Sequence, residues 1–339
     1  LKIFFFNISA IFFALFIYES ILWIADRKKS KQMSTAYGSG YIEEHPYLGY
    51  GASKDSIFKS KKCIKNEEIY NVTYTIKDRL RYTPNSNEKS QNCVLFFGCS
   101  FTYGEGLSDS STLPFYFNQF AKNEYKILNY GFHGYGTNHM LALIENRVTK
   151  DIQGCKNKKI AIYSFIPDHV ARAAGYRELY RRGAKGPRYE IINGKLKKVG
   201  DFSESWGMTE KILSQSYTYR RLFAKKLKPS HYDFIRVVEI IKKSKELLFQ
   251  DGVILYVFIW DYKGYEKAFI NTSDYDYFLD EMEKNNIITL FLHDAIPDYD
   301  EKKQTYIIPN DGHPNCLANE KIAKYLYSQI IEINIIDQK

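Results

Sequence analysis

Residues Val94 to Gly106 read VLFFGCSFTYGEG, and this stretch decides the fold that we predict for the chain. The apolar run Val94–Phe97 is short and ends at Gly98, which predicts a buried strand running into a tight turn. Ser100 follows on that turn, and a helical pattern covers residues 112–121. A hydroxyl between a strand end and a helix suits a nucleophile, because the backbone N–H groups of the turn can stabilise an oxyanion.

The C-terminal part of the chain supplies a candidate base. Residues 309–315 read PNDGHPN, so Asp311 and His313 lie two positions apart, ahead of a predicted final helix. Serine first and Asp/His last is one of the chain orders that assemble a Ser-His-Asp group. We therefore predict Ser100 as the nucleophile, His313 as its general base and Asp311 as the group that holds the imidazole. A nucleophilic thiol at Cys99 is the alternative at this turn, although a cysteine there is more often a small buried side chain.

Strands alternate with helical patterns in the rest of the chain. The predicted strands cover residues 93–97, 125–129, 159–165, 252–260 and 287–292, and the clearest helix covers residues 138–152. This alternation predicts an α/β fold: a three-layer α/β/α sandwich with a central parallel sheet of about five strands. Binding residues of such sheets gather at the carboxyl ends of the strands. We therefore expect one crevice to hold Ser100, Gly131, Gly134 and Asp168.

Three motifs resemble those of the SGNH (GDSL-type) hydrolases, over the chain from about Val94 to its end. They are GCSFTYGEGL at 98–107, NYGFHGYGT at 129–137 and DGHPN at 311–315. The resemblance implies a flavodoxin-like hydrolase fold and a serine esterase that forms an acyl-enzyme at Ser100, with neither cofactor nor metal. It also implies an oxyanion hole made by the backbone N–H groups of Ser100 and Gly134.

The chain departs from the family pattern at two positions. Cys99 stands where the family usually has Asp, and the segment SFIPD at 164–168 lacks the family's Asn. That Asn normally supplies a third oxyanion donor, so we expect Asn138, His169 or Arg172 to replace it, without a pattern that chooses among them. Asp168 at the end of this segment, and His169 and Arg172 just after it, are expected to contact substrate.

The motifs are compatible with three functions. Hydrolysis of an ester is the leading hypothesis, and O-acyl transfer to an envelope glycan would use the same three residues with a sugar hydroxyl in place of water. A non-catalytic binding module is the third, because the family's Asn is missing. The expected partner is an ester-bearing small molecule, lipid or glycan. Nucleic acid is not expected, because the net charge of +9 accompanies no nucleic-acid-reading motif.

The N-terminal segment is predicted to be a single-pass membrane anchor. Residues 3–25 are apolar except for Asn7, Ser9, Glu19 and Ser20, and a helix of that length spans about 34 Å. A cleaved signal peptide and a buried soluble helix remain alternatives. Four basic residues follow between 27 and 31, which by the positive-inside rule puts the large domain in the cytoplasm. The family resemblance implies the extracytoplasmic side, and we favour that side.

We divide the chain into three parts: residues 1–31 as the anchor and basic flank, 32–92 as a Tyr-rich extension with edge strands, and 93–339 as the hydrolase-like domain. Residues 68–76 alternate and predict a strand in the extension. A basic insertion at about 175–229 interrupts the last part, and we expect it to cap the site. It contains a predicted hairpin at 188–199 and a predicted helix at 209–227.

The charge of this insertion has two interpretations. Residues 176–198 carry eight Lys or Arg against two Glu. They either bind an anionic substrate or lipid headgroup, or form an ordinary solvated surface.

The five cysteines, at 63, 93, 99, 155 and 316, predict neither a disulfide scaffold nor a zinc site. One disulfide, for instance between Cys63 and Cys93, is compatible with the sequence, although no pattern selects that pair. The seven histidines show no metal-ligand spacing.

Overall fold

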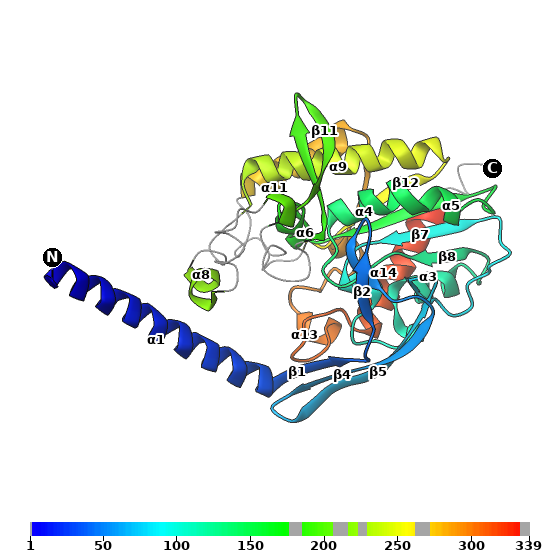
Figure 1. Cartoon of the computed structure of the whole chain (residues 1–339). Helices are drawn as coiled ribbons and strands as arrows, with labels where there is room; N and C mark the ends of the chain where they lie inside the picture. The colour runs from blue at the N-terminus through cyan, green and yellow to red at the C-terminus, as the bar shows by residue number, and fades with distance from the viewer. Residues whose placement is uncertain (1, 176–184, 206–215, 223–228, 262–271, 333–339) are drawn as a thin grey trace.

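The computed structural model describes residues 2–175, 185–205, 216–222, 229–261 and 272–332 (Figure 1). A sheet with the strand order β1-β4-β5-β6-β8-β7-β9-β12-β13 forms its centre. The parallel part consists of β8 Lys126–Asn129, β7 Cys93–Phe97, β9 Lys159–Phe165, β12 Ile254–Ile259 and β13 Ile288–Phe291. The predicted parallel sheet of about five strands is confirmed. These strands are nearly continuous apolar runs because helices cover both of their faces.

Helices pack on the two faces of the sheet and give the predicted three layers. One face carries α4 Thr137–Leu143, α6 Asp168–Ala173, α9 His231–Gln250 and α11 Thr272–Lys284. The other carries α3 Leu113–Phe120, α12 Leu292–Ala295, α13 Lys303–Tyr306 and α14 Cys316–Tyr327. The predicted helix at 138–152 is interrupted, because a π-helical turn, Ile144–Val148, separates α4 from α5 Thr149–Asp151.

The segment between the N-terminal helix and β7 extends the central sheet. Its strands are β1 Met33–Tyr37, β4 Ser56–Ile64, β5 Glu67–Lys77 and β6 Leu80–Arg81, all antiparallel to their neighbours. The β6 strand joins the parallel part where Arg81 pairs with Asn129 of β8. A separate hairpin, β2 Ile42–His45 and β3 Gly49–Ala52, follows β1. The extension therefore continues the main sheet and brings β4 and β5 beside the parallel strands.

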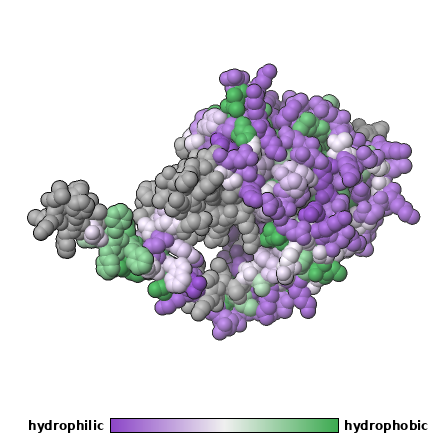
Figure 2. Space-filling model, in the orientation of Figure 1, coloured by the Kyte–Doolittle hydropathy of each residue, from purple (hydrophilic) through white to green (hydrophobic). Residues whose placement is uncertain are grey.

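The N-terminal helix α1, Lys2–Gln32, projects from the rest of the molecule (Figure 1). Within it, Ser9–Lys28 is long and apolar enough to cross a membrane, and none of that stretch is buried against the protein. Figure 2 shows apolar surface on this helix, apart from the mainly polar face of the rest of the molecule. A signal sequence would have the same length and composition, so the helix is a candidate anchor.

The basic insertion is described only in part. Its predicted hairpin is present as β10 Pro187–Ile192 and β11 Lys195–Asp201, joined at Asn193 and Gly194, and it packs against α4 and α9. Within the predicted helix at 209–227 the structure describes α8 Tyr217–Leu222. Residues 176–184, 206–215 and 223–228 lie outside the described residues, so the cap stays a prediction.

One disulfide joins Cys93 to Cys155, whose Cα atoms are 5.9 Å apart. The example pair Cys63–Cys93 is therefore wrong. Cys93 begins β7, and Cys155 lies in the turn that leads to the neighbouring strand β9, so the two thiols meet at the amino ends of adjacent strands. Cys63, Cys99 and Cys316 are free.

Candidate active site

Ser100 occupies the position that the sequence predicted, at the first residue of the short helix α2, Ser100–Tyr103, directly after β7. The turn depends on Gly98, whose φ of 151° favours glycine. A Cβ atom at Gly98 would lie 2.2 Å from Oγ1 of Thr102. Since Ser100 begins a helix, its N–H has no acceptor within that helix.

His313 and Asp311 meet Ser100 in one hydrogen-bonded line. Nε2 of His313 lies 2.8 Å from Oγ of Ser100, and its Nδ1 hydrogen-bonds Oδ1 of Asp311. The Asp311 side chain is fully buried, whereas that of His313 is 20% exposed. A bridge between Ile307 and Pro314 closes the loop that carries both residues. The structure thus brings together three side chains from opposite ends of the domain.

Charged neighbours shape the ionisation of this group. Burial alone would lower the pKa of His313, but the hydrogen bond to Asp311 and the carboxylate of Glu105 outweigh burial, and the pKa is raised. Burial opposes ionisation of Asp311 as well, yet the contacts with His313 and Lys62 hold the pKa of its carboxyl below the ordinary value. The imidazole thus faces an ionised Asp311, as a general base requires.

The glycine-rich loop after β8 lies against the serine turn. The N–H of Phe132 donates to the carbonyl of Gly98 at 3.4 Å, and a Cβ at Gly131 would come within 2.7 Å of the Tyr103 nitrogen. The Gly131 N–H donates to the Asn129 side chain at 3.0 Å, so it is not directed to an oxyanion. Gly134 has a φ of 76° on the same loop. The N–H groups of Ser100 and Gly134 remain the candidate oxyanion donors.

Two predicted site residues are core residues. The Asn138 carboxamide is fully buried and donates to the carbonyl of Pro187 at 2.8 Å, so it holds the hairpin against α4. His169 is fully buried, and its Nδ1 lies 2.7 Å from the hydroxyl of Tyr163. Burial, with Arg172 nearby, lowers the pKa of His169 far below its ordinary value, and the ring is neutral. These contacts give both side chains a structural part, and roles for Asn138 in the oxyanion hole and for His169 in substrate contact stay predictions.

Asp168 and Arg172 support the glycine-rich loop. The guanidinium of Arg172 donates to the carbonyl of Tyr135 at 2.8 Å and lies 3.6 Å from the Asp168 carboxylate. Both side chains are about one-tenth exposed. This contact fixes the loop from behind. Substrate contact by either residue stays a prediction.

Cys99 points away from the site. It is fully buried among the apolar residues between the sheet and the helices α3 and α14. The aromatic ring on the other side of Ser100 is that of Phe101, whose centroid lies 5.4 Å from the His313 ring and 4.9 Å from the Trp260 ring. These rings pack against one side of the imidazole.

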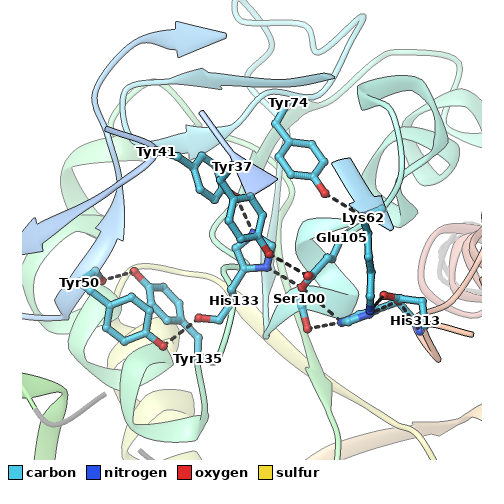
Figure 3. A network of polar contacts seen from close by, with 12 residues as sticks. Tyr37, Tyr41, Tyr50, Lys62, Tyr74, Ser100, Glu105, His133, Tyr135 and His313 are labelled. Carbon is cyan, nitrogen blue, oxygen red and sulfur yellow. Dashed lines mark hydrogen bonds and ion pairs between the residues drawn. The ribbon is translucent and has the colours of Figure 1, made fainter. Parts of the chain in front are cut away.

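Four further polar residues, which the sequence did not predict, surround the group: two contact it directly and two contact it through Glu105 (Figure 3). Lys62 pairs with Asp311, and Glu105 lies 3.4 Å from Nε2 of His313. His133 and Tyr37 in turn bind Glu105, at 2.7 and 2.9 Å. Glu105 and His133 stand inside the motifs GCSFTYGEGL and NYGFHGYGT, so the motifs contained the signal. Lys62 and Tyr37 belong to the extension, where no motif marks them.

No family model and no curated protein matches the chain. Solved structures of SGNH- and GDSL-type hydrolases and esterases are similar to it. Axe2, an acetylxylan esterase from Geobacillus stearothermophilus, is 13% identical with a TM-score of 0.42, over 71% of this chain and 95% of its own. AlinE4, an SGNH-hydrolase family esterase, is 13% identical with a TM-score of 0.37, over 71% and 96%. A candidate lipolytic protein of the G-D-S-L family from Desulfitobacterium hafniense DCB-2 is 12% identical with a TM-score of 0.40, over 69% and 97%.

Proposed function

We propose that the protein is a serine esterase whose nucleophile is Ser100. The observation that carries the proposal is the 2.8 Å contact between Oγ of Ser100 and Nε2 of His313, with the buried Asp311 on the opposite nitrogen. A serine hydroxyl is inert without such a base, and the imidazole needs a carboxylate to hold its tautomer. A site that only binds ligands has no use for this arrangement.

The first half of the reaction acylates the serine. Oγ of Ser100 attacks the ester carbonyl while its proton passes to Nε2 of His313, and Asp311 stabilises the imidazolium. The carbonyl oxygen becomes an oxyanion, which the N–H groups of Ser100 and Gly134 stabilise. When the carbon–oxygen bond of the ester breaks, the leaving alcohol takes the proton from His313.

The second half returns the enzyme to its starting state. Water gives a proton to Nε2 of His313 and attacks the acyl group on Ser100. A second oxyanion forms at the same two N–H groups. Its collapse releases the carboxylic acid and returns the proton to Oγ of Ser100.

A fluorophosphonate probe, which labels activated serines, tests the proposal on the full chain in detergent micelles. We expect labelling of the wild type and of Cys99→Ala, and loss of labelling in Ser100→Ala. Ser108→Ala is the matched control, because Ser108 lies in the same loop and bonds only neighbouring serines among the described residues. Wild-type protein that stays unlabelled while folded, or Ser100→Ala that still labels, would contradict the proposal.

We propose that α1 anchors the enzyme in a membrane, with the catalytic part on the extracytoplasmic side. The disulfide between Cys93 and Cys155 supports this side, because disulfides persist in oxidising compartments. The basic residues after the anchor favour the opposite side. An alkaline phosphatase fused to the C-terminus, which is active only outside the cytoplasm, decides between them. We expect an active fusion, whereas an inactive but intact fusion would reverse the orientation.

A further inference from the structure

Two charged residues outside the Ser100–His313–Asp311 group contact it from opposite directions. The ammonium of Lys62 reaches Asp311 from the extension, and the carboxylate of Glu105 faces the reacting nitrogen of His313 at 3.4 Å. The Lys62 and Glu105 side chains are only 13% and 14% exposed. Charges removed from water are costly unless they are paired, so their position at the base needs a physical reason.

Lys62 completes the surroundings of the Asp311 carboxylate. Oδ1 of Asp311 accepts from the ring and the backbone N–H of His313, while Oδ2 accepts from Lys62. Side chains alternate between the two faces along β4, so Lys62 shares a face with the buried Ser60. Lys61, the residue before, points to solvent and pairs with Glu68. The alternation along β4 therefore directs one of two adjacent lysines into the site.

Glu105 is held on the opposite side of the imidazole. Oε1 accepts from the hydroxyl of Tyr37 at 2.9 Å, and Oε2 lies 2.7 Å from Nδ1 of His133. The His133 ring in turn bonds the hydroxyl of Tyr41. The Glu105 N–H donates to the Ser100 carbonyl at 3.0 Å, which ties the carboxylate to the turn of the nucleophile. Figure 3 shows Glu105 between His133 and the Ser100–His313 pair.

We propose that Lys62 and Glu105 are positioning residues that act on His313 in opposite directions. Lys62 fixes and neutralises Asp311 from behind, which withdraws negative charge from the ring. Glu105 places negative charge beside Nε2 and favours the imidazolium. Together they keep the His313 imidazole neutral before the reaction and still able to take the serine proton. General-base catalysis is most efficient when the pKa of the base is near the working pH.

The charged and titratable groups around the ring come from several elements. Asp311 and Glu105 supply the negative charge that faces His313, from its own loop and from the turn after α2, and Lys62 of β4 supplies the positive charge. His133 and Tyr37 act through Glu105, and Tyr70 of β5 lies near both carboxylates with its pKa raised chiefly by burial. The extension is thus part of the site.

Titration of His313 tests the proposal without any substrate. The full chain is labelled with ¹³C-histidine in micelles, and His313→Gln assigns the resonance. We expect Lys62→Met to raise the pKa of His313 and Glu105→Gln to lower it, each by about one unit, because a charge within 4–6 Å shifts a pKa by that order. The double variant should return near the wild type. Lys62→Arg keeps the charge and should stay close to the wild-type value.

The surface pair on the same strands provides matched controls. Lys61→Met and Glu68→Gln each remove a charge from β4 or β5 without contacting Asp311 or His313, so they should leave the titration unchanged. Shifts of the same sign in Lys62→Met and Glu105→Gln, or no shift in proteins with native circular dichroism, would overturn the proposal.

The activity readout rests on the proposed function and separates the two ideas. The acid limb of kcat/KM for p-nitrophenyl acetate should move to higher pH in Lys62→Met and to lower pH in Glu105→Gln, because His313 must be neutral to act. Titration shifts without ester turnover would support the positioning roles and refute the esterase. Turnover and serine labelling without titration shifts would refute the positioning roles and leave the esterase in place.

Discussion

Removing the disulfide gives a prediction whose size follows from the structure. Cys93 and Cys155 are 62 positions apart, and closing a loop of that length in the unfolded chain stabilises the native state by about 4 kcal/mol on the chain-entropy account. Each single alanine variant already breaks the bond. Cys93→Ala, Cys155→Ala and the double variant should therefore lose similar stability, and the two single effects should not add.

Urea unfolding of the full chain in micelles, followed through the buried Trp260, measures this loss. With a slope of about 3 kcal/mol per molar, the midpoint should fall by roughly 1.3 M. Cys316→Ser is the control, because that thiol is free and exposed, and it should leave the midpoint unchanged. A thiol titration of the unfolded, unreduced protein should find the three free cysteines. Five reactive thiols in protein purified from its native compartment, or small additive effects, would refute the reasoning.

Three further predictions concern the site and its frame. Asp311→Asn should lower kcat for p-nitrophenyl acetate by a factor on the order of 10³–10⁴ without unfolding the protein, because the amide favours the wrong imidazole tautomer; an unchanged kcat would exclude Asp311 from the reaction. Gly98→Ala should destabilise the fold by several kcal/mol, because the new Cβ would meet Thr102 and the backbone has a φ of 151°. Gly154→Ala is the control: a Cβ there would have no atom within 4 Å, so the urea midpoint should change little. His139 and His169 are buried and neutral, with burial lowering the pKa of His139 to about 3 and that of His169 far below its usual range. Because the unfolded chain then binds more protons, stability should fall below pH 6.5 by about 1.4 kcal/mol per pH unit for each ring. His169→Gln should remove one such contribution from the pH dependence of unfolding, and a slope equal to that of the wild type would refute the argument.

The parallel core could be predicted from sequence because its signals are local. Continuous apolar runs mark strands that are covered on both faces, and β7 and β9 have the predicted bounds. Glycines at the ends of these runs mark the turns that carry polar side chains. The motifs around Ser100 and His313 similarly depend on a few adjacent residues, and the structure brings both side chains together.

Contacts between distant segments could not be predicted in this way. No local pattern joins Cys93 to Cys155, and none separates the buried His169 from a histidine that faces substrate. Each depends on which strands become neighbours and on the depth at which a side chain comes to lie.

By itself the sequence determined the parallel α/β core, the serine turn and the histidine loop, since strand patterns and turn chemistry are written over a few residues. Only the tertiary structure decided how the strands of the extension pair with the sheet and that Lys62 reaches Asp311. It also placed Glu105 beside the reacting nitrogen. The interaction between two charges depends on the distance between them, and the distances between residues far apart in the chain are set only when the strands pair.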